Sequence, residues 1–292
     1  MREYVANKGM ALFKLIALGV LCILVVGVAV GAWGYHRDRA HARAARTALA
    51  GLRQPDPPRF DASMIADLPE IAQRYFTRAI EPGTPLHRVV SLEMEGTFTL
   101  NGTPMPMAAS QILAPVTRGF VWEASIGQGF MRFSGSDGYV ALDGPVNSWT
   151  RFWLHGLIPL ARVGGTPDHA RDAAARAMLE TIWVPASLLP QHGARWVQTG
   201  PDSAEIRFAD LPDEGPMQIT LDPQGDVASV QAMRWSDANP ARTYRLQPFG
   251  GQMLESRQIA GFRIPVRVVL GNHFGTDDYA PFFEATVTSA TY

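Results

Sequence analysis

One uninterrupted apolar run near the N-terminus, Leu15–Trp33, constrains this chain more than any other feature. The run has 19 residues and contains no charged side chain. At about 1.5 Å of rise per residue, a helix of this length spans about 28 Å, close to the thickness of the hydrocarbon layer of a bilayer. Backbone N–H and C=O groups in that layer must bond within the segment, so the run must be helical. No second run of this kind occurs in the chain. The sequence therefore predicts a membrane anchor over residues 1–35, with residues 15–35 in contact with the bilayer.

A cleaved signal peptide is the alternative for this segment. Signal peptides have a shorter apolar region, of about 7–15 residues, which ends at small residues. This run is longer, and it ends beside Trp33 and Tyr35, whose rings are typical of the membrane–water interface. A lipoprotein signal is not indicated, because Leu21 precedes Cys22 where a small residue is needed. We therefore expect the anchor to be retained.

The charges that flank the run leave its orientation open. Basic residues both precede it (Arg2, Lys8, Lys14) and succeed it (Arg37, Arg39, Arg43, Arg46, Arg53). The positive-inside rule gives almost a tie, with a slight preference for a cytoplasmic C-terminal domain. Single N-terminal anchors in bacteria nevertheless commonly export the domain attached to them, and long domains translocate largely regardless of charge. We expect a single-pass protein of the bacterial inner membrane with a periplasmic soluble domain, and a cytoplasmic domain is the alternative.

The composition of the remaining chain excludes some classes of partner. The formal net charge of the 292 residues is −1, and without residues 1–35 it is −3. A nearly neutral domain has no strong electrostatic attraction to nucleic acid, so no nucleic-acid partner is expected. The single cysteine, Cys22, lies inside the apolar run, so neither a disulfide within the chain nor a thiol site in the soluble part is possible.

Two further segments lie between the anchor and the soluble domain. Residues 36–52 are rich in alanine and arginine and are expected to continue the helix out of the bilayer, with their arginines at the lipid headgroups. The segment Gln54–Pro58 contains three prolines and is typical of a short stiff linker. We therefore expect a juxtamembrane helix and linker over residues 36–58, and then one soluble domain over residues 59–292.

The soluble domain changes its hydrophobic period twice. Apolar residues recur at helical spacing from Leu68 to Ile80, after a capping residue at Asp67. Strand patterns fill residues 89–142, with a hairpin at Asn101-Gly102 and an interruption near Ser136–Gly138. Thr166-Pro167 then opens an alanine-rich helix that runs to about Trp183, and strand patterns return from residue 194 to residue 291, with a turn at 249–251. This order predicts an α+β fold in which a large curved antiparallel sheet, resembling a half-barrel, packs on two or three helices.

The densest motif of the chain lies at the end of this second helix pattern. Arg176, Glu180 and Trp183 are spaced i, i+4, i+7 and share one helix face. The simpler interpretation is a salt bridge over a tryptophan that fills the core. The functional interpretation places Arg176 and Glu180 at the mouth of a cavity, where they orient a polar head group.

The spacing R-x3-E-x2-W-x-P-x2-L-L-P of residues 176–190, with Ala194-Arg-Trp196 after it, resembles an uncharacterised bacterial family that is defined only as a domain of unknown function. Gly261–Pro265 and Tyr279–Phe283 also fit, and the resemblance covers about residues 60–292. Members of the family often have an N-terminal anchor, and no activity is established for it. Its order of strands, helix and strands is distantly similar to the half-barrels of periplasmic lipoprotein carriers, in which a curved sheet wraps helices and holds acyl chains.

A second segment combines aromatic residues with no clear period. Trp149, Phe152 and Trp153 lie in residues 149–163, which fit neither a strand nor a helix. Aromatic residues are common in ordinary cores, but they also line pockets for lipid tails. We expect these three residues to form a mobile lid over such a pocket, or a patch that dips into the membrane beside the anchor.

The sequence contains no pattern typical of catalysis. It has neither H-x3-H nor H-E-x-x-H for a metal ion, and G-x-S-x-G for a serine nucleophile is also missing. We therefore predict no catalytic residue, metal or cofactor. The preferred hypothesis is a membrane-tethered binding module for a lipophilic ligand, with Trp149, Phe152, Trp153, Arg176, Glu180 and Trp183 as candidate ligand-binding residues. An envelope protein-interaction domain without a small ligand is the first alternative, and its protein partner is unknown. An enzyme of unknown class is the second.

Overall fold

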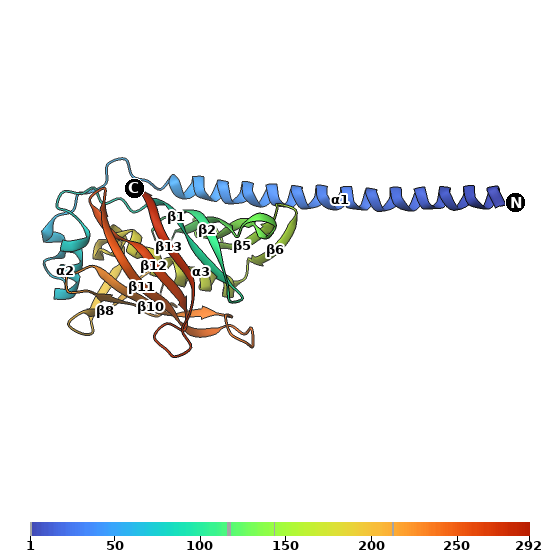
Figure 1. Ribbon diagram of the computed structural model, residues 1–292. Helices are drawn as coiled ribbons and strands as arrows, with labels where there is room; N and C mark the ends of the chain where they lie inside the picture. The colour runs from blue at the N-terminus through green and yellow to red at the C-terminus, as the bar shows by residue number, and fades with distance from the viewer. Residues whose placement is uncertain (1, 116–117, 143, 212) are drawn as a thin grey trace.

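The computed structural model describes residues 2–115, 118–142, 144–211 and 213–292, with side chains from Phe13 onward. A long N-terminal helix projects from a domain built of one curved sheet and shorter helices (Figure 1). The helices are α1 (Arg2–Ala50), α2 (Glu70–Ala79), α3 (Pro167–Leu179) and the 3-10 helices η1 (Ala62–Ile65), η2 (Gly129–Met131), η3 (Glu180–Trp183), η4 (Pro185–Leu188) and η5 (Pro190–His192).

All thirteen strands of the described chain belong to one antiparallel sheet with the order β6-β5-β4-β3-β2-β1-β13-β12-β11-β10-β9-β8-β7. The strands are β1 (Val90–Leu100), β2 (Thr103–Leu113), β3 (Gly119–Ile126), β4 (Phe133–Val140), β5 (Asn147–Leu154), β6 (Ile158–Gly164), β7 (Ala194–Gln198), β8 (Ser203–Phe208), β9 (Met217–Leu221), β10 (Val227–Ser236), β11 (Arg245–Ile259), β12 (Phe262–Asn272) and β13 (Ala280–Thr291). The pairing of β1 with β13 joins the two meanders and leaves β6 and β7 as the edges.

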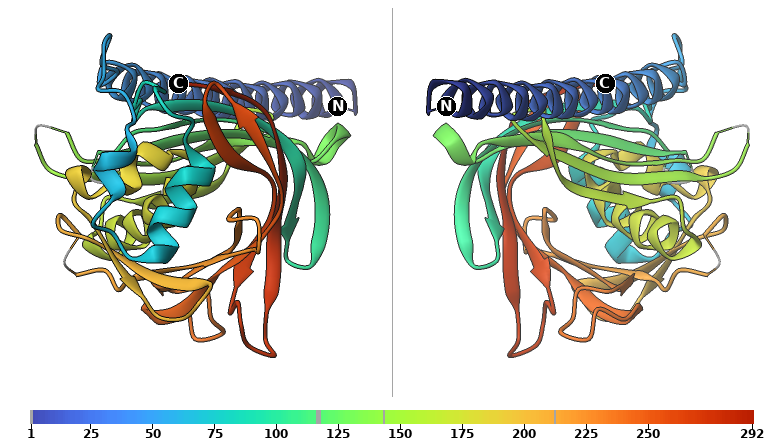
Figure 2. Two further views of the ribbon diagram at one scale, coloured as in Figure 1. Left: turned by 90° about the vertical axis from the view of Figure 1, so that its left-hand side faces the viewer. Right: turned by 90° about the vertical axis from the view of Figure 1, so that its right-hand side faces the viewer.

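The sheet curves around the segment that connects its two edge strands (Figure 2). This segment contains α3 and the 3-10 helices η3, η4 and η5, and α2 packs against β7, β8 and β12. The concave face and these helices form one core that includes Phe76, Trp183 and Phe262. The predicted α+β fold, with a large curved antiparallel sheet on helices, is confirmed.

Turn chemistry sets the register of the sheet at two hairpins. Asn101 and Gly102 both have positive φ, 51° and 78°, and connect β1 to β2 with Leu100 opposite Thr103. Ala260 and Gly261 repeat this geometry between β11 and β12, with φ of 50° and 84°. A two-residue turn with positive φ at both positions has the twist that antiparallel strands need, so the hairpin predicted at Asn101-Gly102 is confirmed.

Three local predictions are wrong. Asp67 does not cap α2, whose N-cap is Pro69; Asp61 instead caps η1 by accepting a hydrogen bond from the Ser63 backbone N–H. Residues 249–251 do not turn, because β11 runs through Gly250 and Gly251. An added Cβ there would lie 2.2 Å from the carbonyl oxygen of Val230 or 1.9 Å from that of Val269, so glycine allows neighbouring strands to approach closely. Ser136–Gly138 likewise lies inside β4.

Residues 149–163 contain most of β5 and of β6, so this segment is part of the sheet. The apolar period is lost because both faces of β5 are covered, as Phe152 faces the helices on the concave side and Trp149 packs beneath α1 on the convex side.

The C-terminal part of α1 packs on the convex face of the sheet. Ala42 and Leu49 are fully buried against Val121 and Trp149. Asp38 of α1 forms ion pairs with Arg151 and Arg162.

Two arginines that follow the apolar run bond to the sheet, and one of them, Arg46, was expected at the lipid headgroups. Arg46 pairs with Glu123 at 3.5 Å, and Arg53 donates to Ser91 at 2.7 Å. The helix therefore continues without a break from its exposed apolar part into a part that is packed on the domain (Figure 1).

Candidate functional site

One face of α3 and the first turn of η3 carries four polar side chains. His169, Asp172, Arg176 and Glu180 recur every three or four residues, so they lie in one row along the helix. Thr166 caps α3 with Pro167 in its first turn, as the sequence predicts, and this fixes where the row begins. The helix does not continue to Trp183, because η3 replaces its last predicted turn.

Arg176 lies between two carboxylates. Its Nε donates to Glu180 Oε1 at 2.7 Å, and its Nη1 donates to Asp137 Oδ2 on β4 at 2.5 Å. Burial lowers the pKa of the Arg176 guanidinium, but the charges of Glu180 and Asp137 outweigh burial and leave the pKa raised. The guanidinium also lies 4.5 Å above the centre of the Phe120 ring. Its position is therefore fixed by charge on one side and by an aromatic face on the other.

Both carboxylates accept a second hydrogen bond from the sheet. Gln111 Nε2 on β2 donates to Glu180 Oε2 at 2.6 Å, and both side chains are buried. Thr150 Oγ1 on β5 donates to Asp137 Oδ1 at 2.7 Å. The Arg176 cluster, defined as Arg176, Asp137, Glu180, Gln111 and Thr150, is thus a network that joins three strands to the helix row.

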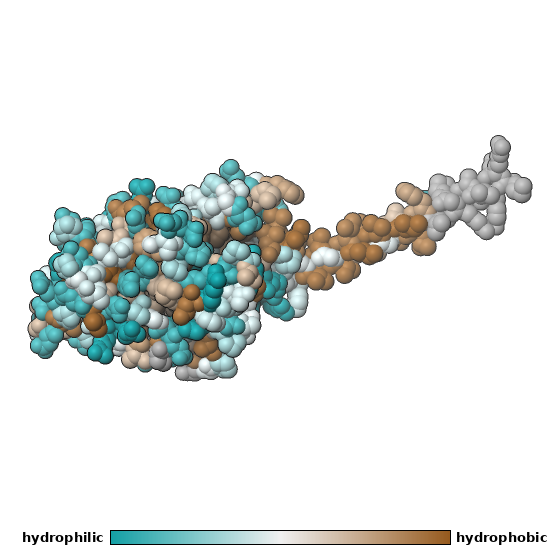
Figure 3. Space-filling model, turned by 90° about the horizontal axis from the view of Figure 1, so that it is seen from below, coloured by the Kyte–Doolittle hydropathy of each residue, from teal (hydrophilic) through white to brown (hydrophobic). Residues whose placement is uncertain are grey.

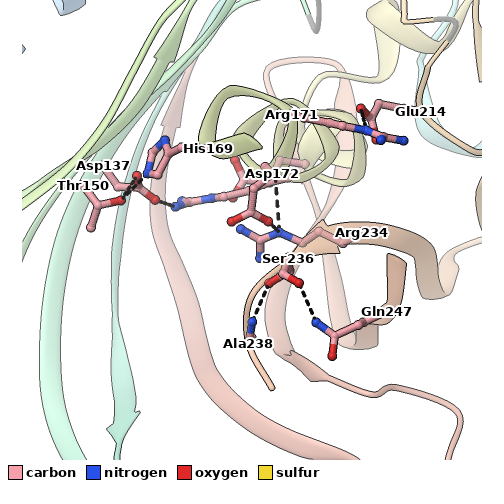
Figure 4. Close-up of polar contacts among 12 residues, drawn as sticks. Asp137, Thr150, His169, Arg171, Asp172, Glu214, Arg234, Ser236, Ala238 and Gln247 are labelled. Carbon is pink, nitrogen blue, oxygen red and sulfur yellow. Dashed lines mark hydrogen bonds and ion pairs between the residues drawn. The ribbon is translucent and has the colours of Figure 1, made fainter. Parts of the chain in front are cut away.

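The row also contacts the other half of the sheet. Asp172 forms an ion pair with Arg234 Nε on β10, while His169 lies 3.2 Å from Thr150 Oγ1 on β5 (Figure 4). Burial raises the pKa of the Asp172 carboxyl, and the neighbouring Arg234 charge reduces that effect. The Arg234 guanidinium lies 4.6 Å above the centre of the Phe249 ring.

A cavity of about 350 Å³ lies between this row and the concave face of the sheet. Of the described residues, 16 apolar side chains line it, and the polar members are Asp137, Thr150, Arg176, Glu180 and Arg234. The aromatic part of the lining comes from Phe98, Trp122, Phe133, Phe152, Trp183, Phe249, Phe282 and Phe283. The volume lies in the range of about 300–1,000 Å³ that is usual for small-molecule sites.

Three side chains at the cavity have hydrogen-bond donors without a partner among the described residues. Arg176 uses Nε and Nη1, which leaves Nη2, and Arg234 uses Nε, which leaves both Nη atoms. The indole N–H of Trp122 is buried and also has no partner in the part of the chain that is described. A buried donor without a partner is rare in folded proteins, so the Trp122 N–H favours a ligand acceptor nearby, and the two guanidinium groups have further N–H groups available to it.

The structure brings four of the six candidate ligand-binding residues together and separates two. Phe152, Arg176, Glu180 and Trp183 line the cavity. Trp183 is held by its Nε1, which donates to the Pro265 carbonyl at 2.9 Å.

Trp149 and Trp153 lie on the opposite face of β5, because alternate residues of a strand point to opposite sides. Trp149 donates to Ser136 Oγ at 2.9 Å, and Trp153 donates to Asp38 of α1 at 3.0 Å.

Sequence reasoning missed Asp137, Thr150, Arg234, Gln111 and Asp172. Helical spacing could have identified Asp172, which precedes Arg176 by four residues. The four strand residues gave no local signal, because only the pairing of distant strands brings them to α3.

A second hollow of about 620 Å³ lies between α1 and the convex face, and is lined by Tyr35, Asp38, Arg39, Arg132 and Arg151 among others. Its polar side chains are largely engaged with one another, since Arg132 donates to Ser125 at 2.8 Å and Arg151 pairs with Asp38. Within the described ranges, no three His, Cys, Asp or Glu side chains are close enough to hold a metal ion.

The pattern of a family of unknown function, DUF6544, matches residues 58–285, and the chain belongs to this family. No curated protein matches the chain. Two solved structures are similar over 76% of this chain and 90% of their own. One is a domain described as an outer membrane lipoprotein-sorting protein from Vibrio parahaemolyticus, at 11% identity and a TM-score of 0.38. The other is a DUF1329 family protein from Desulfovibrio piger, at 8% identity and a TM-score of 0.42.

Proposed function

We propose that this member of the DUF6544 family is a membrane-tethered, non-catalytic binding module for a lipid or another amphiphile in the bacterial envelope. The observation that carries the proposal is the cavity of about 350 Å³, whose walls are mainly aromatic and whose polar members include the Arg176 cluster. An amphiphile has the same division into an apolar tail and a polar head.

The aromatic walls favour a hydrocarbon tail. Phe98, Trp122, Phe282 and Phe283 contribute rings whose centres lie 5.7 to 6.4 Å from one another in contacting pairs. A tail that enters this space gains about 0.8 kcal/mol for each methylene group that it removes from water. About ten methylene groups supply the energy of about 8 kcal/mol that corresponds to micromolar affinity, before the cost of association is subtracted.

The free donors favour a head group that accepts hydrogen bonds. Arg176 and Arg234 offer guanidinium N–H groups, and their two positive charges already pair with three carboxylates, those of Asp137, Glu180 and Asp172. Such a site suits an oxygen atom that accepts hydrogen bonds, such as a carbonyl, at the polar end of the ligand.

The alternatives fit the geometry less well. A protein-interaction domain without a small ligand needs a filled concave face, whereas this one is hollow. An enzyme needs a carboxylate or histidine that is available for proton transfer, and Asp137 and Glu180 each already bind Arg176 and a second donor.

The tether is α1. Its apolar window has a mean hydropathy of 2.9, and only 6% of it is buried. Cleavage of a signal peptide near residue 35 would cut the helix beside Asp38, which is paired with the sheet. This continuity supports a retained anchor over residues 15–35. We place the anchor in the inner membrane and the domain in the periplasm.

The test is native mass spectrometry of the full chain, released from mild detergent, with extraction of any molecule that stays bound. We expect one amphiphile per chain. Ala161, which lines the cavity from β6, offers a matched pair: Ala161→Trp fills the space and is expected to abolish the extra mass, whereas Ala161→Ser keeps it. A chain without any bound molecule, even after incubation with total membrane lipid, would contradict the proposal.

A further inference from the structure

The end of the domain from which α1 projects exposes a group of large apolar side chains. Phe130 and Met131 of η2 are 79% and 59% exposed, and Ile158 and Leu160 of β6 are 57% and 52% exposed. With Trp33 of α1 and Leu157, they form what is called here the end surface. Soluble monomers rarely gather so many large apolar side chains in one place, so this surface has a partner.

Contacts among α1, the turn at residues 155–157 and η2 place the end surface beside residues 31–35 of α1. Gly31 of α1 packs against the backbone of Leu157, and Tyr35 packs against Gly156. His155 in the same turn lies 2.9 Å from the carbonyl oxygen of Phe130 through its Nε2. In Figure 3 the apolar residues gather where the helix leaves the domain.

The apolar span of α1 begins at this level. Side chains from Phe13 to Val30 are exposed, and burial against the domain begins at Gly31. Since the exposed part is about 27 Å long, a bilayer that accommodates it has one surface near residues 31–33. Trp33, with the Arg37 guanidinium 4.8 Å above its ring, has the side chains that favour the interface.

We propose that the end surface docks on the lipid layer of the same bilayer that holds α1, at the headgroup region. The occupant is the lipid surface itself, because the membrane span continues directly from the end surface along one rigid helix. Unpaired backbone groups of the edge strand β6 are tolerated in the hydrated headgroup region, and not in the hydrocarbon layer.

Docking has a consequence for the ligand, which rests on the function proposed above. Leu160 belongs both to the end surface and to the lining of the cavity. The cavity therefore borders the membrane, and its amphiphile exchanges with the lipid layer without crossing bulk water.

The test measures how deeply two positions of the full chain lie in vesicles. Cys22→Ala removes the single native cysteine, and Met131→Cys or Val197→Cys then places an NBD fluorophore on the end surface or on β7. Val197 is 40% exposed, and its neighbour Gln198 accepts a hydrogen bond from Ile71 of α2, at the other end of the domain. Vesicles contain phosphatidylcholine and phosphatidylglycerol with a small fraction of nitroxide-labelled lipid.

We expect about threefold stronger nitroxide quenching and a blue-shifted emission at position 131, since interfacial groups reach about 5–10 Å into the lipid layer. Ile158→Cys is the second reporter and is expected to behave like position 131. Equal, solvent-like signals at positions 131, 158 and 197 would overturn docking. Blue-shifted emission at positions 131 and 158 without nitroxide quenching would also overturn docking, because it would show that a protein or a second copy of the chain covers this surface. Docking without a bound amphiphile would contradict the function proposed above and leave docking intact.

Discussion

Arg176 is the residue on which the polar part of the cavity depends. It forms ion pairs with two carboxylates at once, those of Asp137 and Glu180. Replacement by methionine keeps most of the side-chain volume but leaves both acids without a cation. We expect Arg176→Met to lower the free energy of unfolding by about 3 kcal/mol, as is usual when one member of a buried ion pair is removed. Urea denaturation measures the change.

Arg257 supplies the matched control, because its ion pair with Glu255 is exposed, at 59% and 46% of the side-chain areas. Arg257→Met should change stability by less than about 1 kcal/mol. Equal effects of the two substitutions would show that the Arg176 cluster is not a buried network.

His192 gives the domain a pH dependence that is independent of the cavity. Burial and the nearby Arg88 charge lower the pKa of His192 from 6.5 to about 4. The unfolded chain therefore takes up the proton first, so this stabilisation is complete above about pH 6.5 and is lost as the pH falls toward 4. Because the imidazole is partly exposed, we expect a loss of about 1 kcal/mol between pH 7 and pH 5.

His192→Gln has no proton to gain in this range and should lose less stability than the wild type over the same interval. Urea titrations at pH 7 and pH 5 compare the two proteins. A wild-type chain that is no more sensitive to acid than the variant would contradict the assignment.

At the residue scale, sequence spacing identified Arg176 and Glu180 because both lie on one helix turn. Asp137 lies 39 positions from its partner Arg176 and Arg234 lies 62 positions from its partner Asp172, so both escaped detection because only strand pairing brings them to α3. The same holds for Trp149 and Trp153, because which face of a strand is covered by α1 is decided by packing over more than 100 residues.

At the scale of elements, α1 has an exposed apolar part and a part that packs on the sheet, and Gly34 lies near the point where the two parts meet. An added Cβ at Gly34 would lie 2.8 Å from the Trp153 ring, whereas one at Gly27 meets no described atom within 4 Å. Gly34→Val should therefore separate α1 from the sheet and cost about 2 kcal/mol by overpacking. Hydrogen exchange of residues 38–50 and urea denaturation report both effects.

Gly27→Val is the matched control, and it should change neither exchange nor stability. If both substitutions leave residues 38–50 equally protected, the contact between α1 and β5 is not what holds the helix in place.

The elements that the sequence predicted well are those with local causes. The hairpin at Asn101-Gly102 and the start of α3 at Thr166-Pro167 result from turn and cap chemistry. The continuous strand through Gly250 and Gly251 was not predicted, because glycine occurs both in turns and where neighbouring strands approach closely. Residues 149–163 lost their strand period because two different layers cover the two faces of β5.

At the scale of the whole molecule, α1 leaves the domain at one end (Figures 1 and 3). The end surface lies at the same end, and it includes Leu160, which also lines the cavity. The docking proposed above requires that the anchor stay attached. The chain isolated from membranes should have the intact mass of 31.9 kDa and resist extraction by alkaline carbonate. A soluble product that starts near residue 35 would contradict a retained anchor.

The central claim is that an amphiphile occupies the concave cavity, and photo-crosslinking tests it most directly. The full chain in vesicles is loaded with a fatty acid that carries a diazirine on its tail, illuminated and digested, and the modified peptides are sequenced. The account predicts modification of cavity residues, above all Phe152 of β5 and Phe282 and Phe283 of β13, and its loss in Ala161→Trp. Modification confined to α1, with none on the concave face, would contradict it.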